Sequence, residues 1–175
     1  LRLDAAVADA FRAPRLTANA NARKIQSGAE GPFDVAAEVS GPLSELAFRL
    51  DLTGPKDGLR SMHAAGRIDA AGQPLTMTIA QFDAQIASYG LALQQPMRIT
   101  SGAGRLSIRD LDLTIGDGSL RGWFDVQPGS TSVVMNAERL PLGIARAWVK
   151  GLPTGALSLQ TSLTGNRGET TGSFE

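Results

Sequence analysis

Hydrophobic and polar residues alternate with a period of two over most of the chain. In the stretch Phe33–Val39, the apolar side chains at every second position are separated by Asp34, Ala36 and Glu38. Successive side chains of a β-strand point to opposite faces of a sheet, so this pattern predicts strands with one dry face and one wet face. Similar alternation occurs at residues 46–53, 75–80, 120–126 and 157–164.

One long alternating run changes phase. Leu106 and Ile108 share a face, but the next apolar set begins at Leu111, so an extra residue lies near Arg109–Asp110. An extra residue in one strand of a pair is a β-bulge, and we expect a bulge or kink here. The run Gly-Asp-Gly-Ser at residues 116–119 separates two alternating segments and predicts a tight hairpin turn.

Residues 141–151 break the alternation. Pro141 at the start and Gly151 at the end follow the asymmetry typical of helix termini. Leu142, Ala145 and Trp148 lie on one face of such a helix. We predict one short helix near residues 141–150. It either packs as a plug on the apolar face of the sheet or forms an interfacial element whose Trp148 contacts lipid.

Many short strands at regular spacing predict an all-β fold, and a sandwich, a barrel or an extended meander would each satisfy the pattern. No alternation of helices and strands is visible. We expect residues 1–175 to form a single β-rich segment. The sequence starts at Leu1 without methionine and stops at Glu175 within a strand-like stretch, so we expect it to come from a longer, repetitive β protein.

The charge composition provides no electrostatic footprint for nucleic acid or an anionic membrane. The 17 basic and 17 acidic residues of the 175-residue chain balance, and the aromatic residues are not interleaved with basic ones. We therefore expect no nucleic-acid partner. No run approaches the ~18–20 apolar residues of a membrane-spanning helix. The absence of cysteine from this sequence excludes disulfides and thiolate chemistry, and it suits a bacterial envelope protein.

The sequence contains no motif for catalysis or cofactor binding. His63 is the single histidine, so a histidine-based metal site cannot form within this chain. Gly102-Ala103-Gly104 lacks the third glycine of a dinucleotide fingerprint. We expect no enzyme activity, no cofactor and no metal ion. Carboxylates that only folding brings together remain the open route to an enzyme acting on carbohydrate.

Three stretches resemble the β-rich repeats of the TamB family, within the AsmA-like group of bacterial envelope proteins. Phe11–Ile25 is similar to the Pro-led strand units of the family. Gly104–Val126 is similar to its paired strands, in which a Gly-rich turn precedes a Leu-x-Gly strand. Ala137–Asn166 is similar to its Leu-Pro-Leu short helix and the following strand, and Leu140–Gly165 is the most specific part. Leu59–Gln95 matches no signature of the family.

The resemblance implies a long, open, taco-like sheet with an apolar concave face. It implies a periplasmic location, with the parent protein anchored in the inner membrane and reaching an outer-membrane barrel partner of the TamA type. It also implies a role in phospholipid movement between the membranes and in outer-membrane protein assembly, similar in principle to bridge-like lipid transfer proteins. The family supplies no catalytic residues.

The apolar face of such a sheet cannot remain in water, because each bulky side chain costs roughly 1.5–3 kcal/mol to expose. The face must close on itself, pack on a second sheet or hold a ligand such as phospholipid acyl chains. A closed sandwich without lipid and a platform that pairs with client strands are the alternatives. The residues expected to line a lipid groove are Val35, Val39, Phe48, Leu50, Leu52, Leu106, Ile108, Leu113, Ile115, Phe124, Val126, Leu157, Leu159 and Leu163.

Overall fold

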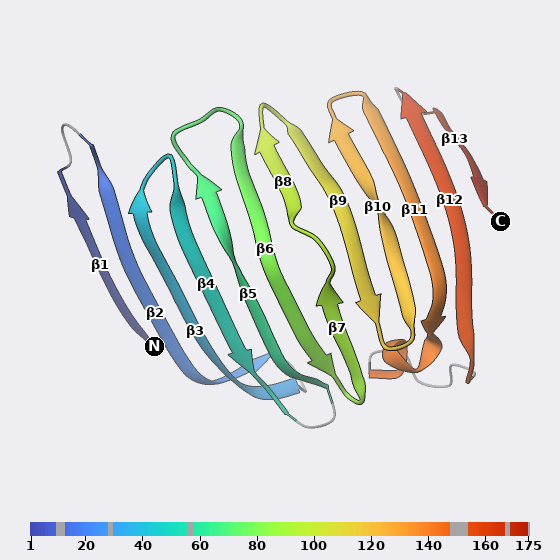
Figure 1. Cartoon of the computed structure of the whole chain (residues 1–175), viewed down its shortest axis with the longest axis horizontal. Coiled ribbons are helices and arrows are strands. Elements are labelled where there is room, and N and C mark those ends of the chain that lie inside the picture. The colour runs from blue at the N-terminus through green and yellow to red at the C-terminus, as the bar shows by residue number, and fades with distance from the viewer. Residues whose placement is uncertain (10–12, 28–29, 56–57, 148–153, 167–168, 175) are drawn as a thin grey trace.

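The protein is all-β, as the alternating sequence predicts. The computed structural model describes residues 1–9, 13–27, 30–55, 58–147, 154–166 and 169–174. In these ranges, thirteen strands form one antiparallel sheet (Figure 1). The strands are β1 (Arg2–Ala8), β2 (Arg15–Ser27), β3 (Glu30–Pro42), β4 (Leu46–Thr53), β5 (Leu59–Asp69), β6 (Leu75–Ile86), β7 (Tyr89–Leu93), β8 (Met97–Gly102), β9 (Arg105–Ile115), β10 (Gly118–Gln127), β11 (Ser130–Pro141), β12 (Ala156–Asn166) and β13 (Glu169–Phe174).

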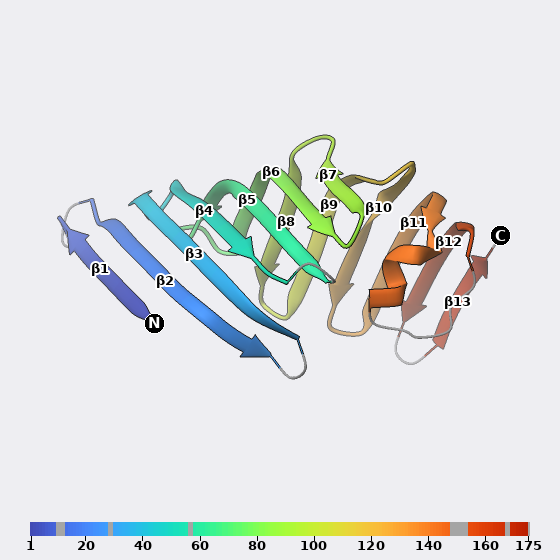
Figure 2. The same ribbon diagram turned by 90° about the horizontal axis from the view of Figure 1, so that it is seen from below.

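The strands follow one another across the sheet as a meander. Nearly every strand pairs with its neighbours in sequence, and the exception is the position between β6 and β9. There β7 and β8 occupy the two halves of one interrupted strand, and the loop between Leu93 and Met97 breaks it. Figure 2 shows one curved layer of strands from β1 to β13. The described residues therefore form an open sheet, and the sandwich alternative is wrong.

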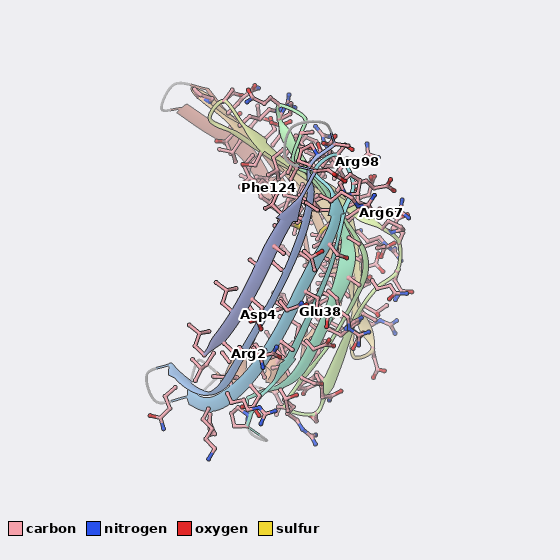
Figure 3. The ribbon with its side chains drawn as sticks, turned by 90° about the vertical axis from the view of Figure 1, so that its left-hand side faces the viewer. Arg2, Asp4, Glu38, Arg67, Arg98 and Phe124 are labelled. Carbon is pink, nitrogen blue, oxygen red and sulfur yellow. The ribbon has the colours of Figure 1, made fainter. Side chains whose placement is uncertain are left out.

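Cross-strand pairing places the apolar positions of successive strands on the same face. Val39 pairs with Phe48, and Ile108 pairs with Phe124. Figure 3 views the sheet along its long axis and shows that it is curved, with Phe124 on the inner side and Arg67 and Arg98 on the outer side. The concave face is therefore the apolar one, because side chains alternate between the two faces along each strand.

A line of β-bulges crosses the middle of the sheet. The pairing register shifts between Ala65 and Gly66 in β5, and between Gly122 and Phe124 in β10. The expected bulge in β9 is present, since Asp110 has a positive φ of 61° within the strand. The β7–β8 interruption lies on the same line. Bulges bend strands, so this line accounts for a crease along the floor of the concave face.

The predicted tight turn and the predicted helix are both present, with one correction to the helix. Gly118 pairs with Ile115, which leaves two residues in the β9–β10 turn. The helix is a 3₁₀ helix, η1, over Leu142–Ala147, and Pro141 still belongs to β11. Such tight helices are common as short connectors, and Gly143 weakens any longer α-helix. Residues 148–151, including Trp148, lie outside the described residues.

No helix in the described part of the chain is long and apolar enough to span a membrane. The η1 segment lies against the end of the sheet. Gly143 packs so closely on the hydroxyl of Tyr89 that an added Cβ would overlap it. Tyr89 pairs with Ile86 and shares the apolar face of the sheet. This contact fits the interpretation in which the helix packs as a plug on that face.

Ion pairs cover the convex face. Arg49 Nε donates to Asp51 Oδ2 at 2.7 Å, and the ring nitrogen Nδ1 of His63 lies 2.8 Å from Asp51 Oδ1. Hydrogen bonds from Arg49 and then from His63 hold the pKa of the Asp51 carboxyl below its ordinary value. These pairs are exposed and contribute little stability each, but they keep the outer face in water.

Asp125 is the most buried carboxylate of this outer face. Only 8% of the residue is exposed, and its side chain accepts hydrogen bonds from Arg105 and from Arg109. The Arg109 guanidinium also lies 4.5 Å from the ring centroid of Trp123. Arg105 in the first place, and then Arg109, hold the pKa of the Asp125 carboxyl below its ordinary value against the opposing effect of burial.

This arrangement predicts a specific acid dependence of stability. A lowered pKa in the folded state stabilises the fold above the ordinary carboxyl value of 3.8, and the contribution is lost as the pH falls through the folded-state pKa. We expect Asp125→Asn to lower the melting temperature at about pH 7 and to reduce its difference from the value at about pH 3. Asp4→Asn is the control, because the Asp4–Arg2 pair is exposed on the edge strand. If the melting temperature of Asp125→Asn fell between about pH 7 and about pH 3 as much as that of the unmodified chain, the stabilising role of the Asp125 carboxylate would be contradicted.

Candidate functional site

The concave face of the sheet is the candidate site. Its ladder positions from β4 to β12 carry no charged side chain, because charged residues of these strands occupy the alternate positions or bulges. The pairs Leu50–Ala64 and Leu113–Leu120 are typical of this face. The ladder pairs therefore form an apolar surface that runs across the strands, in the strand order that Figure 1 shows.

All fourteen residues expected to line a groove share this face. In the N-terminal half, Val35 pairs with Leu52 and Val39 pairs with Phe48. Leu50 lies between Phe48 and Leu52 on β4 and points to the same face. In the central strands, Leu106, Ile108, Leu113 and Ile115 pair with Val126, Phe124, Leu120 and Gly118. In β12, Leu157, Leu159 and Leu163 pair with Leu140, Ala137 and Val133.

The face is only partly shielded from water. The buried apolar residues are Leu46, Ala64, Ala84, Ile115 and Ala137, and each lies on this face. Among the described residues, none of the large side chains is completely buried. Neighbouring side chains thus cover one another along the sheet while their tips stay open to the concave side. A second packed layer would bury them, as in a domain core.

The apolar surface extends beyond the predicted lining. Met62, Phe82 and Leu91 continue it through the region that matched no family signature, and Ile99 of β8 continues it just beyond that region. The sequence of β6 already indicated part of this apolar surface. The apolar positions of β6 switch from Leu75, Met77 and Ile79 to Phe82 and Ile86, and this phase change marks a bulge.

One polar side chain interrupts the apolar face in β12. Thr161 pairs with Met135 and is 8% exposed, and its hydroxyl has no hydrogen-bond partner among the described residues. Such a hydroxyl is costly to bury, since each unsatisfied polar atom loses its bonds to water. It does not provide a catalytic group, because no acid or base lies at the neighbouring ladder positions of the same face.

The first edge of the sheet exposes the apolar surface most. Leu3 and Val7 of β1 are 68% and 63% exposed. They pair with Ala20 and Leu16 of β2 on one side only, since β1 is an edge strand. The apolar face therefore continues to the edge strand, whose charged residues Arg2 and Asp4 occupy the alternate positions on the outer face.

In the described part of the chain, no three histidine or carboxylate side chains lie close enough together to hold a metal ion. Asp112, which the sequence places near two other aspartates, is paired with Arg121 at 3.2 Å. The carboxylates with ion-pair partners lie on the convex face or at the strand ends, away from the apolar surface.

The fold and this face together define a class: an open, one-layer, curved β-sheet protein with an apolar groove. Such a groove can hold aliphatic chains through contact with side chains, and its ladder positions from β4 to β12 carry no charged group. No family model, curated protein or solved structure matches the chain. The proposal below therefore depends on the geometry of the chain itself and on the sequence resemblance.

Proposed function

We propose that this chain is a periplasmic segment of a TamB-like, envelope-spanning protein whose apolar groove conducts phospholipid acyl chains between the inner and outer membranes. The observation that carries the proposal is the uncovered apolar face, which continues across all strands from β1 to β12. An uncovered face of this size needs an apolar occupant, because exposed aliphatic surface costs about 25 cal/mol per Å² in water.

Acyl chains suit this face energetically. Each methylene that enters water loses about 0.8 kcal/mol, but a chain that moves from a bilayer into an apolar groove exchanges one apolar setting for another. The net free energy per methylene is close to zero, and this favours passage over tight retention. A floor without charged groups adds no barrier along the path.

The proposed role includes no catalytic step and no cofactor. In the parent protein, the segment would be held by an anchor in the inner membrane, and its partner at the other membrane would be a barrel of the TamA type. Support of outer-membrane protein assembly is part of the same proposal. It draws on the sequence resemblance together with the length of an open sheet whose strands run across the groove.

A second function is favoured by the two edges of the sheet. Among the described strands, β1 pairs only with β2, and β13 pairs only with β12. Unpaired strand edges accept further strands by β-augmentation, so the chain is also a candidate platform for client strands. This chaperone-like role predicts binding of peptides from barrel precursors in the absence of lipid, which a pull-down with lipid-free protein tests.

The lipid proposal predicts that phospholipid copurifies with the protein. Mass spectrometry of organic extracts is expected to detect phospholipid in amounts comparable to the protein, well above a mock purification from cells without it. The physical reason is that the groove side chains are half-exposed and gain apolar contact. A clean extract from a folded, monomeric chain would contradict lipid occupancy and favour the strand-pairing role.

A further inference from the structure

A hollow of about 820 Å³ lies at one rim of the groove. The β5–β6, β8–β9 and β10–β11 turns form it, and Figure 1 shows these turns side by side along the upper ends of the strands. Gly72 and Pro74 come from the first turn, Ala103 from the second and Pro128 from the third. Its size is within the ~300–1,000 Å³ typical of small-ligand pockets.

The two faces of the sheet meet in this hollow. Leu75 and Ser101 pair across β6 and β8 on the apolar face. Arg105 and Gln127 come from the alternate, polar positions of β9 and β10. The lining is therefore apolar toward the groove and polar toward the outside, and this combination matches an amphipathic ligand.

Exposed apolar side chains gather directly below the hollow. Leu75, Leu106 and Val126 are 39%, 40% and 36% exposed. Ser101 pairs with Leu106, which pairs with Val126, so the three form one row next to the hollow. Between β3 and β11, no other large apolar side chain of the described residues is as exposed. Within this central part of the sheet, the row is where the groove is least covered.

Arg105 supplies the charge of the hollow. It is the single charged side chain of the lining, and its side chain is 50% exposed. Its Nε donates to Asp125 Oδ1 at 3.1 Å, and Arg109 donates to Asp125 Oδ2 at 3.2 Å. Two guanidinium groups share one carboxylate, so this cluster keeps one positive charge. Arg105 also donates from Nη2 to Asp125 Oδ2, so Asp125 occupies that edge of its guanidinium. A guanidinium has five N–H donors, and those that do not contact Asp125 are left for a phosphate group.

The opposite rim differs. The hollow there is lined by Tyr89, Asp117 and Arg139, among others, so one acidic and one basic side chain balance. Gly143 of η1 also packs on Tyr89 at this end of the strands. The asymmetry between the rims gives the groove one side that favours an anionic group.

We propose that the rim hollow is a binding site for the phosphate-bearing headgroup of a phospholipid whose acyl chains lie over Leu75, Leu106 and Val126. This inference rests on the proposed function of the groove, and it adds an orientation: headgroups ride along the rim formed by the β5–β6, β8–β9 and β10–β11 turns. Arg105 provides the anion contact, while Ser101 and Gln127 add polar groups.

Photo-crosslinking tests the position of the headgroup. The purified chain is incubated with vesicles that contain phosphatidylethanolamine with a diazirine either on the headgroup amine or at the end of an acyl chain. The headgroup probe is expected to label residues 72–75, 101–105 and 127–128, and the chain probe the groove strands. Headgroup labelling at the opposite rim, or uniform labelling of both rims, would overturn the proposal.

Two variants test the chemistry of the hollow. Arg105→Gln is expected to weaken binding of phosphatidylglycerol by at least about tenfold, the usual effect of losing one hydrogen bond to a charged group. Gly102→Val should act similarly without a change of charge, because its added Cβ meets Pro74 Cβ at 3.0 Å and narrows the hollow. Arg121→Gln is the matched control, since it pairs with Asp112 away from the hollow. Melting curves check that each variant folds.

Diacylglycerol, which lacks phosphate, separates this inference from the proposed function. Neither variant should change diacylglycerol binding. If the unmodified chain binds diacylglycerol and phosphatidylglycerol equally and both variants leave both unchanged, the groove function stands and the headgroup site is overturned. If the chain binds neither lipid, the proposed function itself fails. Inorganic phosphate that protects the hollow from labelling while lipid does not would assign the site to free phosphate and overturn the lipid assignment.

Discussion

Replacement of both Phe48 and Leu113 by aspartate is expected to abolish lipid occupancy while the chain keeps its β-type circular dichroism. Both side chains lie on the apolar face, in β4 and β9, and both are partly exposed. A carboxylate in contact with an acyl chain is stripped of water without a hydrogen-bonded partner, and this costs several kcal/mol. Each ~1.4 kcal/mol lowers affinity about tenfold, so copurifying phospholipid should fall at least tenfold.

The control places the same two charges on the opposite face. Ala47→Asp combined with Gln81→Asp changes exposed positions of the outer face, and Ala47 is the immediate neighbour of Phe48. This variant should keep its lipid. The open sheet tolerates a carboxylate on the apolar face, because the tips of its side chains already reach solvent. Unfolding of the groove variant at neutral pH, with the control intact, would mean that the face is a closed core, and the groove proposal would fail.

A second large effect is expected from Gly66→Ala, which should lower the free energy of unfolding by about 3 kcal/mol and the melting temperature by about 6–12 °C. Gly66 lies at the bulge between β5 and β6 and pairs with Ile79. An added Cβ would overlap the Thr78 carbonyl oxygen and lie 2.9 Å from the Phe48 ring. The Thr78 carbonyl oxygen cannot move away without disturbing the backbone pairing of β5 and β6.

The measurement is urea or thermal unfolding followed by circular dichroism, with Gly58→Ala as the control. Gly58 has no heavy atom within 4 Å of an added Cβ, so its substitution should change stability by less than about 0.5 kcal/mol. Since Gly66 lies on the crease, Gly66→Ala should also reduce lipid occupancy of the molecules that remain folded. Equal stability of the two variants would show that the crease relaxes without cost.

Much of the fold followed from local sequence patterns. The alternation at residues 33–39 and 46–53 predicts both the strands and their shared apolar face, since side-chain direction along a strand has a period of two. The extra residue near Asp110 and the turn at residues 116–119 were equally visible, because each concerns only a few neighbouring residues. All fourteen predicted lining residues share one face for the same reason.

Other features depended on contacts between distant residues. Strands of an open sheet and strands of a sandwich show the same alternation, so the sequence could not distinguish the two architectures. The pairing order of the thirteen described strands places them in one sheet, and this excluded the sandwich. The tandem placement of β7 and β8 between β6 and β9 likewise depends on partners outside the segment. The position of the short helix likewise depends on a distant residue, since Gly143 packs against Tyr89.

The sequence by itself determined the strands at its alternating segments, their dry faces and fourteen residues of the apolar floor, because these follow from the geometry of a single extended chain. Tertiary structure alone decided that the sheet stays open, where it creases and which rim carries the hollow beside Arg105. Those properties depend on register and bulge positions in neighbouring strands. A bulge acts on the sheet only through the strand it faces, and no local pattern specifies that partner.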